Sequence, residues 1–239
     1  LGVSIYDSPA QPVGACHEPA RDTPVAGSAD VIVCGAGPAG VSAAISAART
    51  GACTRLIEVH GCLGGVWTAG LLSNIIDSGN KTGLMPEILL RLRPTGSQID
   101  AVRYDAECMK GLLEKMCVEA GVKVLLHTRV VAAYKDNANR LTTIVTENKS
   151  GREAWRGKIF VDTTGDGDLA ALAGCRFDLG HPVTGKMQPM TLMALLMGVD
   201  YPALHERRLI RGDGISSTVP APKGISPEES KRNFLAELR

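Results

Sequence analysis

The chain has 239 residues, of which 44% are hydrophobic and 4% aromatic, and its net charge is +1 at pH 7. A chain of this length and apolar content can bury a substantial core. The absence of a basic excess and the few aromatic side chains argue against a nucleic-acid-binding protein, which needs positive charge or stacking surfaces. No unbroken apolar stretch approaches the roughly 20 residues of a membrane span, so we expect no membrane association.

The first elements predict the beginning of a nucleotide-binding fold. Residues 1–29 are rich in Pro, Gly, Ala and Ser, which predicts an irregular N-terminal arm. The apolar strand at 31–34 then runs directly into a glycine-rich turn. In such a turn Gly35 permits the sharp bend, Gly37 lets the backbone approach phosphates, and Gly40 lets the next helix pack on the strand. The complete turn consists of Gly35, Ala36, Gly37, Pro38, Ala39 and Gly40.

The segment after the turn completes this unit. Apolar residues recur at helical spacing over 41–50, and a strand follows at 53–59. The strand carries Glu58 about 20 residues beyond the glycines, where a carboxylate can accept hydrogen bonds from ribose hydroxyls. An isolated glycine turn is the alternative. The combination of strand, turn, helix, second strand and acidic residue favours a dinucleotide site.

The middle of the chain predicts the rest of an α/β fold. A helix is expected at 105–120, because its apolar residues share one face and a glycine follows it. Strand-like runs follow at 122–126, 129–134, 140–147 and 153–156, and the last three predict an antiparallel meander. A further apolar strand at 158–161 ends at the carboxyl edge of the parallel sheet, where ligands bind in open α/β folds. A last helix is expected at 227–239.

Metal and disulfide chemistry are not predicted. Asp162, Asp166 and Asp168 alternate as the ligands of a hard cation can, but they lack the spacing and the final Glu of a calcium loop. A solvated loop is the simpler interpretation. The seven cysteines form no CxxC pair, which argues against a zinc ribbon or a thioredoxin-like site. Free thiols, with no secretory signal in the first thirty residues, indicate a cytoplasmic protein.

Several stretches resemble the FAD-dependent oxidoreductases of the glutathione reductase-like flavoproteins, which bind two dinucleotides. The stretches are GAGPAG at 35–40, EVHGCLGGVWTAG at 58–70, HEPARDTPV at 17–25, DTTGDGDLA at 162–170 and QPMTLM at 188–193. The resemblance implies a Rossmann-like FAD-binding domain at 30–175, with a parallel sheet and an inserted antiparallel meander. Residues 176–239 would begin a substrate or cap domain. Chains of that family are about twice as long, so the resemblance also implies a fragment, a cleaved chain or one subunit.

The same resemblance implies the cofactor and the residues that contact it. FAD would occupy the fold, with Glu58 on the adenosine ribose and the Gly64-Gly65 doublet near the second phosphate and the ribitol. The backbone at Val130 would meet the adenine. The remaining residues expected in the cofactor site are the glycine turn at 35–40, Val59, Trp67, Thr68, Thr164, Gly165 and Asp166, with Ser73 and Asn74 as further candidate walls of the flavin site. Core packing is the alternative for Trp67.

We therefore expect an FAD-dependent oxidoreductase that oxidises a small organic substrate by hydride transfer to the flavin. His181 and Arg176 are the candidates for acid or base work, because they begin the predicted substrate side. The expected partners are a small-molecule substrate and a complementary C-terminal segment or chain, and a homo-oligomer stays open. Two alternatives for the function stay open as well: an NAD-dependent dehydrogenase, and a non-catalytic FAD-binding half that needs a partner chain.

Overall fold

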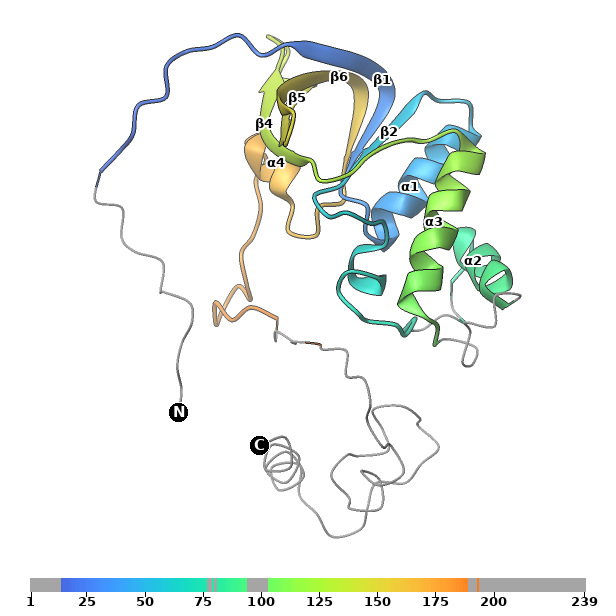
Figure 1. Ribbon diagram of the computed structural model, residues 1–239. Helices are drawn as coiled ribbons and strands as arrows, with labels where there is room; N and C mark the ends of the chain where they lie inside the picture. The colour runs from blue at the N-terminus through green and yellow to red at the C-terminus, as the bar shows by residue number, and fades with distance from the viewer. Residues whose placement is uncertain (1–13, 77–78, 80, 94–102, 189–192, 194–239) are drawn as a thin grey trace. The chain divides into compact units, whose positions relative to one another are not determined.

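A computed structural model describes residues 14–76, 79, 81–93, 103–188 and 193, all within the first of two compact units, residues 1–193 (Figure 1). The predicted helix at 227–239 and the QPMTLM stretch from residue 189 to 192 lie outside the described residues. The elements in chain order are β1 (Val25–Cys34), α1 (Pro38–Arg49), β2 (Thr54–Ile57), η1 (Gly65–Trp67), α2 (Leu84–Leu92), α3 (Ala106–Ala120), β3 (Lys123–Leu125), β4 (Arg129–Lys135), β5 (Leu141–Asn148), β6 (Gly151–Asp162) and α4 (Asp168–Leu172).

The strands form one six-stranded mixed sheet in the order β3-β2-β1-β6-β5-β4. Strands β3, β2, β1 and β6 are parallel neighbours, whereas β6, β5 and β4 pair antiparallel. Helices α1, α2 and α3 lie together beside the parallel strands, and α4 lies beside β4 (Figure 1). This arrangement confirms the predicted α/β fold with a parallel sheet and an antiparallel meander.

Strand β6 corrects the prediction of two separate strands at 153–156 and 158–161. It is one continuous strand, because its residues 151–156 pair with β5 and its residues 154–162 pair with β1, so that the two pairings overlap. Gly157 separates the two predicted runs in sequence but does not break the strand. A Cβ at this position would come within 2.8 Å of the Phe160 ring, so the glycine makes room for that side chain.

Other boundaries also differ from the predictions. Strand β1 begins at Val25, inside the predicted arm of 1–29, because Val25 and its neighbours pair with the first half of β6. Helix α1 begins at Pro38, inside the glycine turn, since proline fits the first helical position. Helices α2 and α4 were not predicted. Helix α3 confirms its prediction: the Asp105 carboxylate accepts hydrogen bonds from two backbone amides at its start, and Gly121 ends it with φ of 80°.

Two buried clusters occupy the two faces of the sheet. The larger joins β1 and β2 to α1, α2 and α3, and includes Val33, Ile45, Leu113 and Met116, all fully buried or nearly so. The smaller lies under the meander and α4, around Ile32, Ile144, Trp155 and Leu169. The glycine turn and the end of β6 therefore sit between two packed layers, which fixes the carboxyl edge of the sheet.

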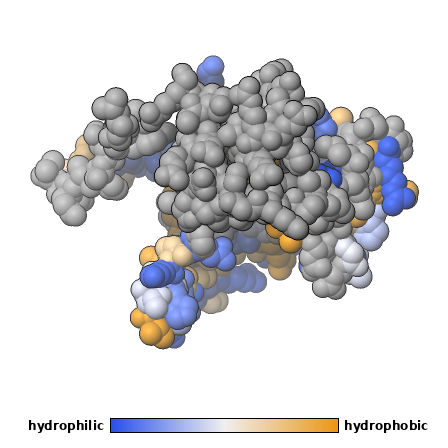
Figure 2. Space-filling view, turned by 90° about the horizontal axis from the view of Figure 1, so that it is seen from below, coloured by the Kyte–Doolittle hydropathy of each residue, from blue (hydrophilic) through white to orange (hydrophobic). Residues whose placement is uncertain are grey.

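On the part of the surface that Figure 2 colours by hydropathy, hydrophobic residues lie at several separate places among hydrophilic ones. In the described part of the chain no helix is both long and apolar enough to cross a membrane. Among the same residues no group of three or more His, Cys, Asp or Glu side chains is placed to hold a metal ion.

Five of the seven cysteines are either clearly exposed or clearly buried, and Cys62 and Cys108 are intermediate. Cys16, Cys53 and Cys175 are exposed, while Cys34 and Cys117 are buried. Burial raises the pKa of Cys34 to about 12 and that of Cys117 to about 11, so neither forms a thiolate at neutral pH. We expect a thiol reagent at pH 8 to label the three exposed cysteines rapidly. Cys34 and Cys117 should be labelled only after unfolding, as peptide mass analysis would show; rapid labelling of Cys34 in the native chain would contradict the fold.

A set of ion pairs ties three helices together. Glu87 of α2 accepts two hydrogen bonds of 2.8 Å from Arg49 of α1, and also pairs with Arg91, which contacts Glu119 of α3. The hydrogen bond from Arg49, followed by the charges of both arginines, holds the pKa of Glu87 below its ordinary value. A lowered folded pKa stabilises the fold above the unfolded pKa, and this stabilisation disappears as the pH falls through the lowered value.

We therefore expect Glu87→Gln to lower the free energy of unfolding at pH 7 by about 0.5–1 kcal/mol, a small figure because water screens these partly exposed pairs. The difference from wild type should vanish in acid, below the lowered pKa of Glu87. Urea unfolding across this pH range measures both effects. Glu114→Gln is the matched control, because Glu114 is an exposed residue of α3 outside these ion pairs.

Candidate cofactor site

The turn between β1 and α1 imposes a different requirement on each glycine. Gly35 has φ of +95°, and a Cβ there would lie 2.3 Å from the Thr163 carbonyl oxygen. A Cβ on Gly40 would lie 1.8 Å from the Gly35 carbonyl oxygen. Gly37, by contrast, has φ of −65°, and a Cβ there would meet no atom within 4 Å. The fold thus requires glycine at positions 35 and 40. The packing of the chain does not require glycine at position 37, whose Cα faces open space.

The N-terminus of α1 faces this open space. Pro38 occupies the first turn of the helix. The first amide of the helix that bonds to a preceding carbonyl is that of Val41, which donates to Gly37 O at 3.0 Å. The Ala39 and Gly40 amides precede this bond and have no carbonyl of their own helix to bind. Together with the positive end of the helix dipole, such amides favour an anion such as a phosphate.

The end of β6 holds the turn in place. The Thr163 amide donates to Cys34 O at 2.8 Å, and its hydroxyl lies 2.7 Å from Gly35 O. Asp162 organises the loop that follows, because its carboxylate accepts hydrogen bonds from the Thr164 amide, the Thr164 hydroxyl and the Ala170 amide. This carboxylate is therefore a structural anchor of the loop.

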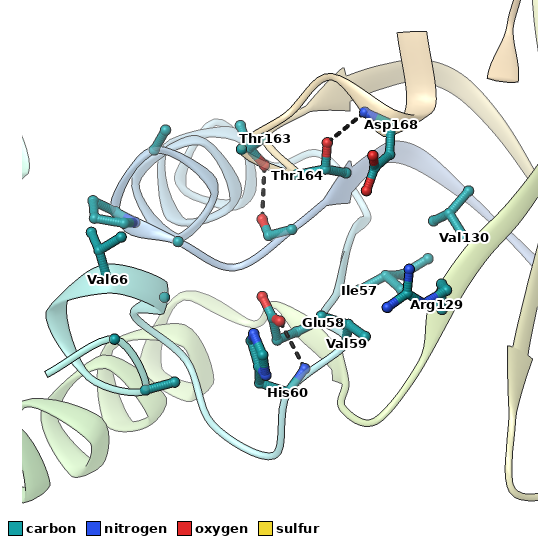
Figure 3. Close-up of a pocket in the computed structure, with 18 of the residues that line it drawn as sticks. Ile57, Glu58, Val59, His60, Val66, Arg129, Val130, Thr163, Thr164 and Asp168 are labelled. Carbon is teal, nitrogen blue, oxygen red and sulfur yellow. Dashed lines mark hydrogen bonds between the residues drawn. The ribbon is translucent and has the colours of Figure 1, made fainter. Parts of the chain in front are cut away.

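Glu58 follows β2 and is only 4% exposed. One carboxylate oxygen accepts from the Ala36 amide at 2.5 Å, and the other accepts from the His60 amide at 2.8 Å. The two amides fix the orientation of the carboxylate and join the second strand to the glycine turn. Figure 3 shows the Glu58 side chain directed toward the middle of the site. A carboxylate held in this way can accept hydrogen bonds from hydroxyl groups.

The glycine doublet packs directly against the first turn. Gly64 and Gly65 have φ of +105° and +52°, which other residues adopt with strain. The Gly64 amide donates to Ala36 O at 2.7 Å, and a Cβ on Gly65 would lie 2.9 Å from the Gly37 Cα. The open space beside Gly37 thus continues along the doublet, beyond the N-terminus of α1.

These segments enclose an open cavity of about 620 Å³ (Figure 3). It follows the carboxyl edge of the sheet, as expected for a ligand site in an open α/β fold. The residues that line it are Gly35, Gly37, Pro38, Ala39, Ile57, Glu58, Val59, His60, Gly65, Val66, Ala69, Gly70, Thr128, Arg129, Val130, Thr163, Thr164, Gly165 and Asp168.

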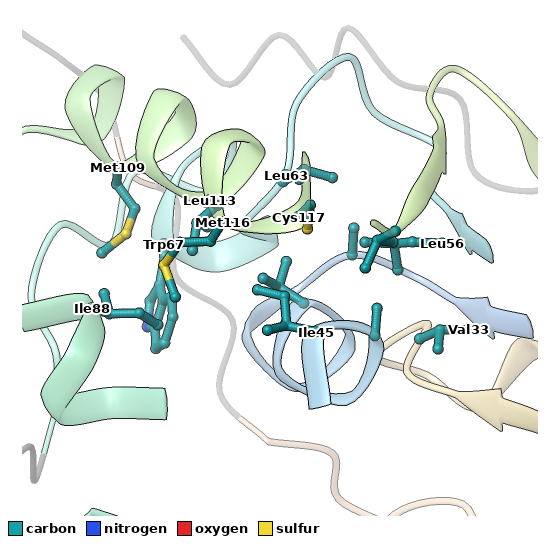
Figure 4. Close-up of a cluster of buried hydrophobic side chains, with 14 of the residues drawn as sticks. Val33, Ile45, Leu56, Leu63, Trp67, Ile88, Met109, Leu113, Met116 and Cys117 are labelled. Carbon is teal, nitrogen blue, oxygen red and sulfur yellow. The ribbon is translucent and has the colours of Figure 1, made fainter. Parts of the chain in front are cut away.

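Most of the residues expected to contact the cofactor line this cavity, but six do not: Ala36, Gly40, Gly64, Trp67, Thr68 and Asp166. Three of them are buried next to lining residues and form the layer behind the cavity wall: Ala36, Gly40 and Gly64. Trp67 packs in the core against α2 and α3 (Figure 4). Thr68 is fully buried and donates to Leu63 O, and Asp166 is exposed to solvent.

The other candidate positions lie off the cavity as well. Ser73 and Asn74 do not line it, and Asn74 forms an isolated β-bridge with Arg103. Arg176 and His181 are exposed beyond α4 and do not line it either. The His181 ring nitrogen Nδ1 accepts from the Val183 and Thr184 amides at 3.2 Å, so it closes a local turn.

Sequence reasoning missed several lining residues, among them His60, Thr128, Arg129, Thr163 and Asp168. Each of them follows, or begins, an element at the carboxyl edge of the parallel sheet. The position of a residue relative to this edge is the signal that could have identified it. The position of β4 beside the cavity was not visible in the sequence, because it depends on how the meander folds back.

The mixed sheet, the glycine turn at a helix N-terminus and a carboxylate after the second strand define a dinucleotide-binding protein. The chain belongs to the family of FAD-dependent oxidoreductases, which it matches over residues 30–237. FAD is therefore its cofactor, and the resemblance found in the sequence is confirmed. The open space above Gly37 and the free α1 N-terminus fit a dinucleotide.

Similar solved structures include a geranylgeranyl bacteriochlorophyll reductase-like protein from Thermoplasma acidophilum, at 17% identity and a TM-score of 0.47, covering 62% of this chain and 42% of that one. THI4 from Thermovibrio ammonificans has 20% identity and a TM-score of 0.46, with 61% of each chain covered. The 3-ketosteroid-Δ4-(5α)-dehydrogenase from Rhodococcus jostii RHA1 has 17% identity and a TM-score of 0.41, covering 58% of this chain and 46% of that one. The chain thus spans less than two thirds of each of these proteins. None of the curated proteins compared with the chain matches it.

Proposed function

We propose that the complete protein oxidises a small organic substrate by transferring a hydride to FAD. The observation that carries this proposal is the continuous cavity that joins the α1 N-terminus, the Glu58 carboxylate and the glycine doublet. Bound FAD supplies the electron acceptor, while the protein binds and orients it. Family membership supports FAD as the cofactor and so favours this proposal over the alternative of an NAD-dependent dehydrogenase.

We assign the residues along the cavity as follows. Gly37 and Ala39, with the α1 N-terminus behind them, hold the pyrophosphate, and Glu58 accepts hydrogen bonds from the adenosine ribose. Val59 and Val130 border the adenine. The flavin side of the cofactor extends past Gly65, and the loop with Thr164 and Gly165 covers the ribitol. Ala36, Gly40, Gly64 and Thr68 support these contacts from the layer of residues behind the cavity wall.

We further propose that a complementary C-terminal segment or chain completes the substrate side, within a domain that begins near residue 176. The segment after α4 supports this, because Phe177, Leu179, Val183 and Met187 are between 64% and 86% exposed. Exposed apolar side chains close in sequence are typical of a surface that another part of a protein covers. A second copy of the chain is the alternative cover, and the mass of the native assembly distinguishes the two.

The decisive experiment is anaerobic reduction of the flavin-loaded chain. The purified chain should show a flavin spectrum and release FAD on heating. Candidate substrates should bleach this spectrum if the chain carries the oxidising centre. Retained FAD that dithionite reduces but no substrate reduces would favour the alternative of a non-catalytic FAD-binding half, and co-expression with a longer chain would then test for restored reduction.

A further inference from the structure

The far end of the cavity carries a cation that the proposed assignment leaves without a role. Arg129 begins β4 and is the only Lys or Arg among the described residues that line the cavity. It is exposed, and Figure 3 shows its guanidinium at the end opposite Val66, beside Val59 and Val130. Glu58 lies between this end and the α1 N-terminus.

Arg129 does not form the ion pair that its place in the sheet favours. In the antiparallel register it lies opposite Glu147 of β5, and opposite charges across two strands commonly pair. Within the described part of the chain, however, no ion pair or side-chain hydrogen bond involves Arg129. Its guanidinium is turned to the cavity instead, where it remains available to a ligand.

The position along the cavity decides which part of the cofactor this cation would meet. The pyrophosphate belongs at the α1 N-terminus and the ribose at Glu58, so the group beyond Glu58 is the adenine. A guanidinium is planar and stacks on aromatic rings, and it donates hydrogen bonds to ring nitrogens of a purine. We propose that Arg129 contacts the adenine ring and selects FAD over FMN; this inference rests on the proposed placement of FAD.

The test compares wild type with Arg129→Gln by the quenching of flavin fluorescence. We expect Arg129→Gln to weaken FAD binding about tenfold, the size of a partly desolvated cation–π contact, and to leave FMN binding unchanged. The affinity for ADP, measured by its competition with FAD, should fall by the same factor in the variant. Arg156→Gln is the matched control, because Arg156 is an exposed arginine of β6 that does not line the cavity.

Two further measurements separate adenine from phosphate as the group bound. Inorganic pyrophosphate should compete with FAD equally well in wild type and Arg129→Gln; a loss of pyrophosphate binding in the variant would overturn the proposal. Arg129→Lys keeps the charge but not the planar group that stacks on a ring, so we expect its affinity for FAD to lie between those of wild type and Arg129→Gln. Full affinity in the lysine variant would overturn the proposal too. Failure of wild type to bind FAD or ADP contradicts the proposed site itself, whereas normal binding by all variants contradicts only the role of Arg129.

Discussion

Gly37→Ala should fold like the wild type and lose most of its affinity for FAD. An alanine is tolerated by the local backbone, since φ at this position is −65°, and no atom lies within 4 Å of its Cβ. That Cβ would instead occupy the space in front of the α1 N-terminus, where the phosphates approach the backbone. Losing one or two charge-assisted hydrogen bonds costs about 1.5–3 kcal/mol each, so we expect a weakening of at least tenfold.

The matched control is Gly40→Ala, in the same turn. Its Cβ would lie 1.8 Å from the Gly35 carbonyl oxygen, so α1 must move away from β1. We expect a loss of about 3 kcal/mol or more in the free energy of unfolding, at the upper end of overpacking effects. Thermal unfolding without FAD, measured beside FAD titration, separates the two variants. A Gly37→Ala chain with wild-type affinity would contradict the assignment of this turn to the pyrophosphate.

Glu58→Ala should lose both affinity and stability. The buried Ala36 amide would lose its acceptor, which costs about 1–3 kcal/mol for an unsatisfied buried donor. The ribose would lose a charged acceptor at the same time, so we expect FAD binding to weaken about 100-fold, from the 1.5–3 kcal/mol of a charged hydrogen bond and the loosened turn together. FMN, which lacks the adenosine, should be affected only through the loosened turn.

The measurements for Glu58 are fluorescence titrations with FAD and with FMN, beside urea unfolding without cofactor. Glu58→Gln keeps one acceptor oxygen and should fall between wild type and Glu58→Ala in stability. Glu114→Ala, an exposed position on α3 that does not line the cavity, should change neither affinity. An equal loss of FAD and FMN affinity in Glu58→Gln would contradict a role for Glu58 at the ribose.

The location of the cavity was predictable from the sequence, because local sterics dictate the residues of the glycine turn beside it. The cofactor contacts assigned to these residues stay predictions. Gly35 adopts a φ that favours glycine, and Gly40 packs against the Gly35 carbonyl. The spacing of the glycines in the sequence therefore predicts the shape of the turn. The position of Glu58 could be predicted equally well, since it directly follows the second strand of the same unit. Trp67 shows the limit of this reasoning. It follows the glycine doublet in sequence, yet its ring points into the core formed with α2 and α3, because the fold leaves an apolar space there.

The sequence alone determined the strand–turn–helix unit, the acidic residue after β2, the α/β class and the family, because these depend on neighbouring residues and on hydrophobic periodicity. Only the tertiary structure decided that β6 is a single strand shared by the parallel sheet and the meander. It also decided that Arg129 and Thr163, far from the glycine turn in sequence, line the same cavity. The physical reason is that strand order and the direction of each side chain are set by long-range pairing and by packing against the helices, and neither leaves a local pattern in the chain.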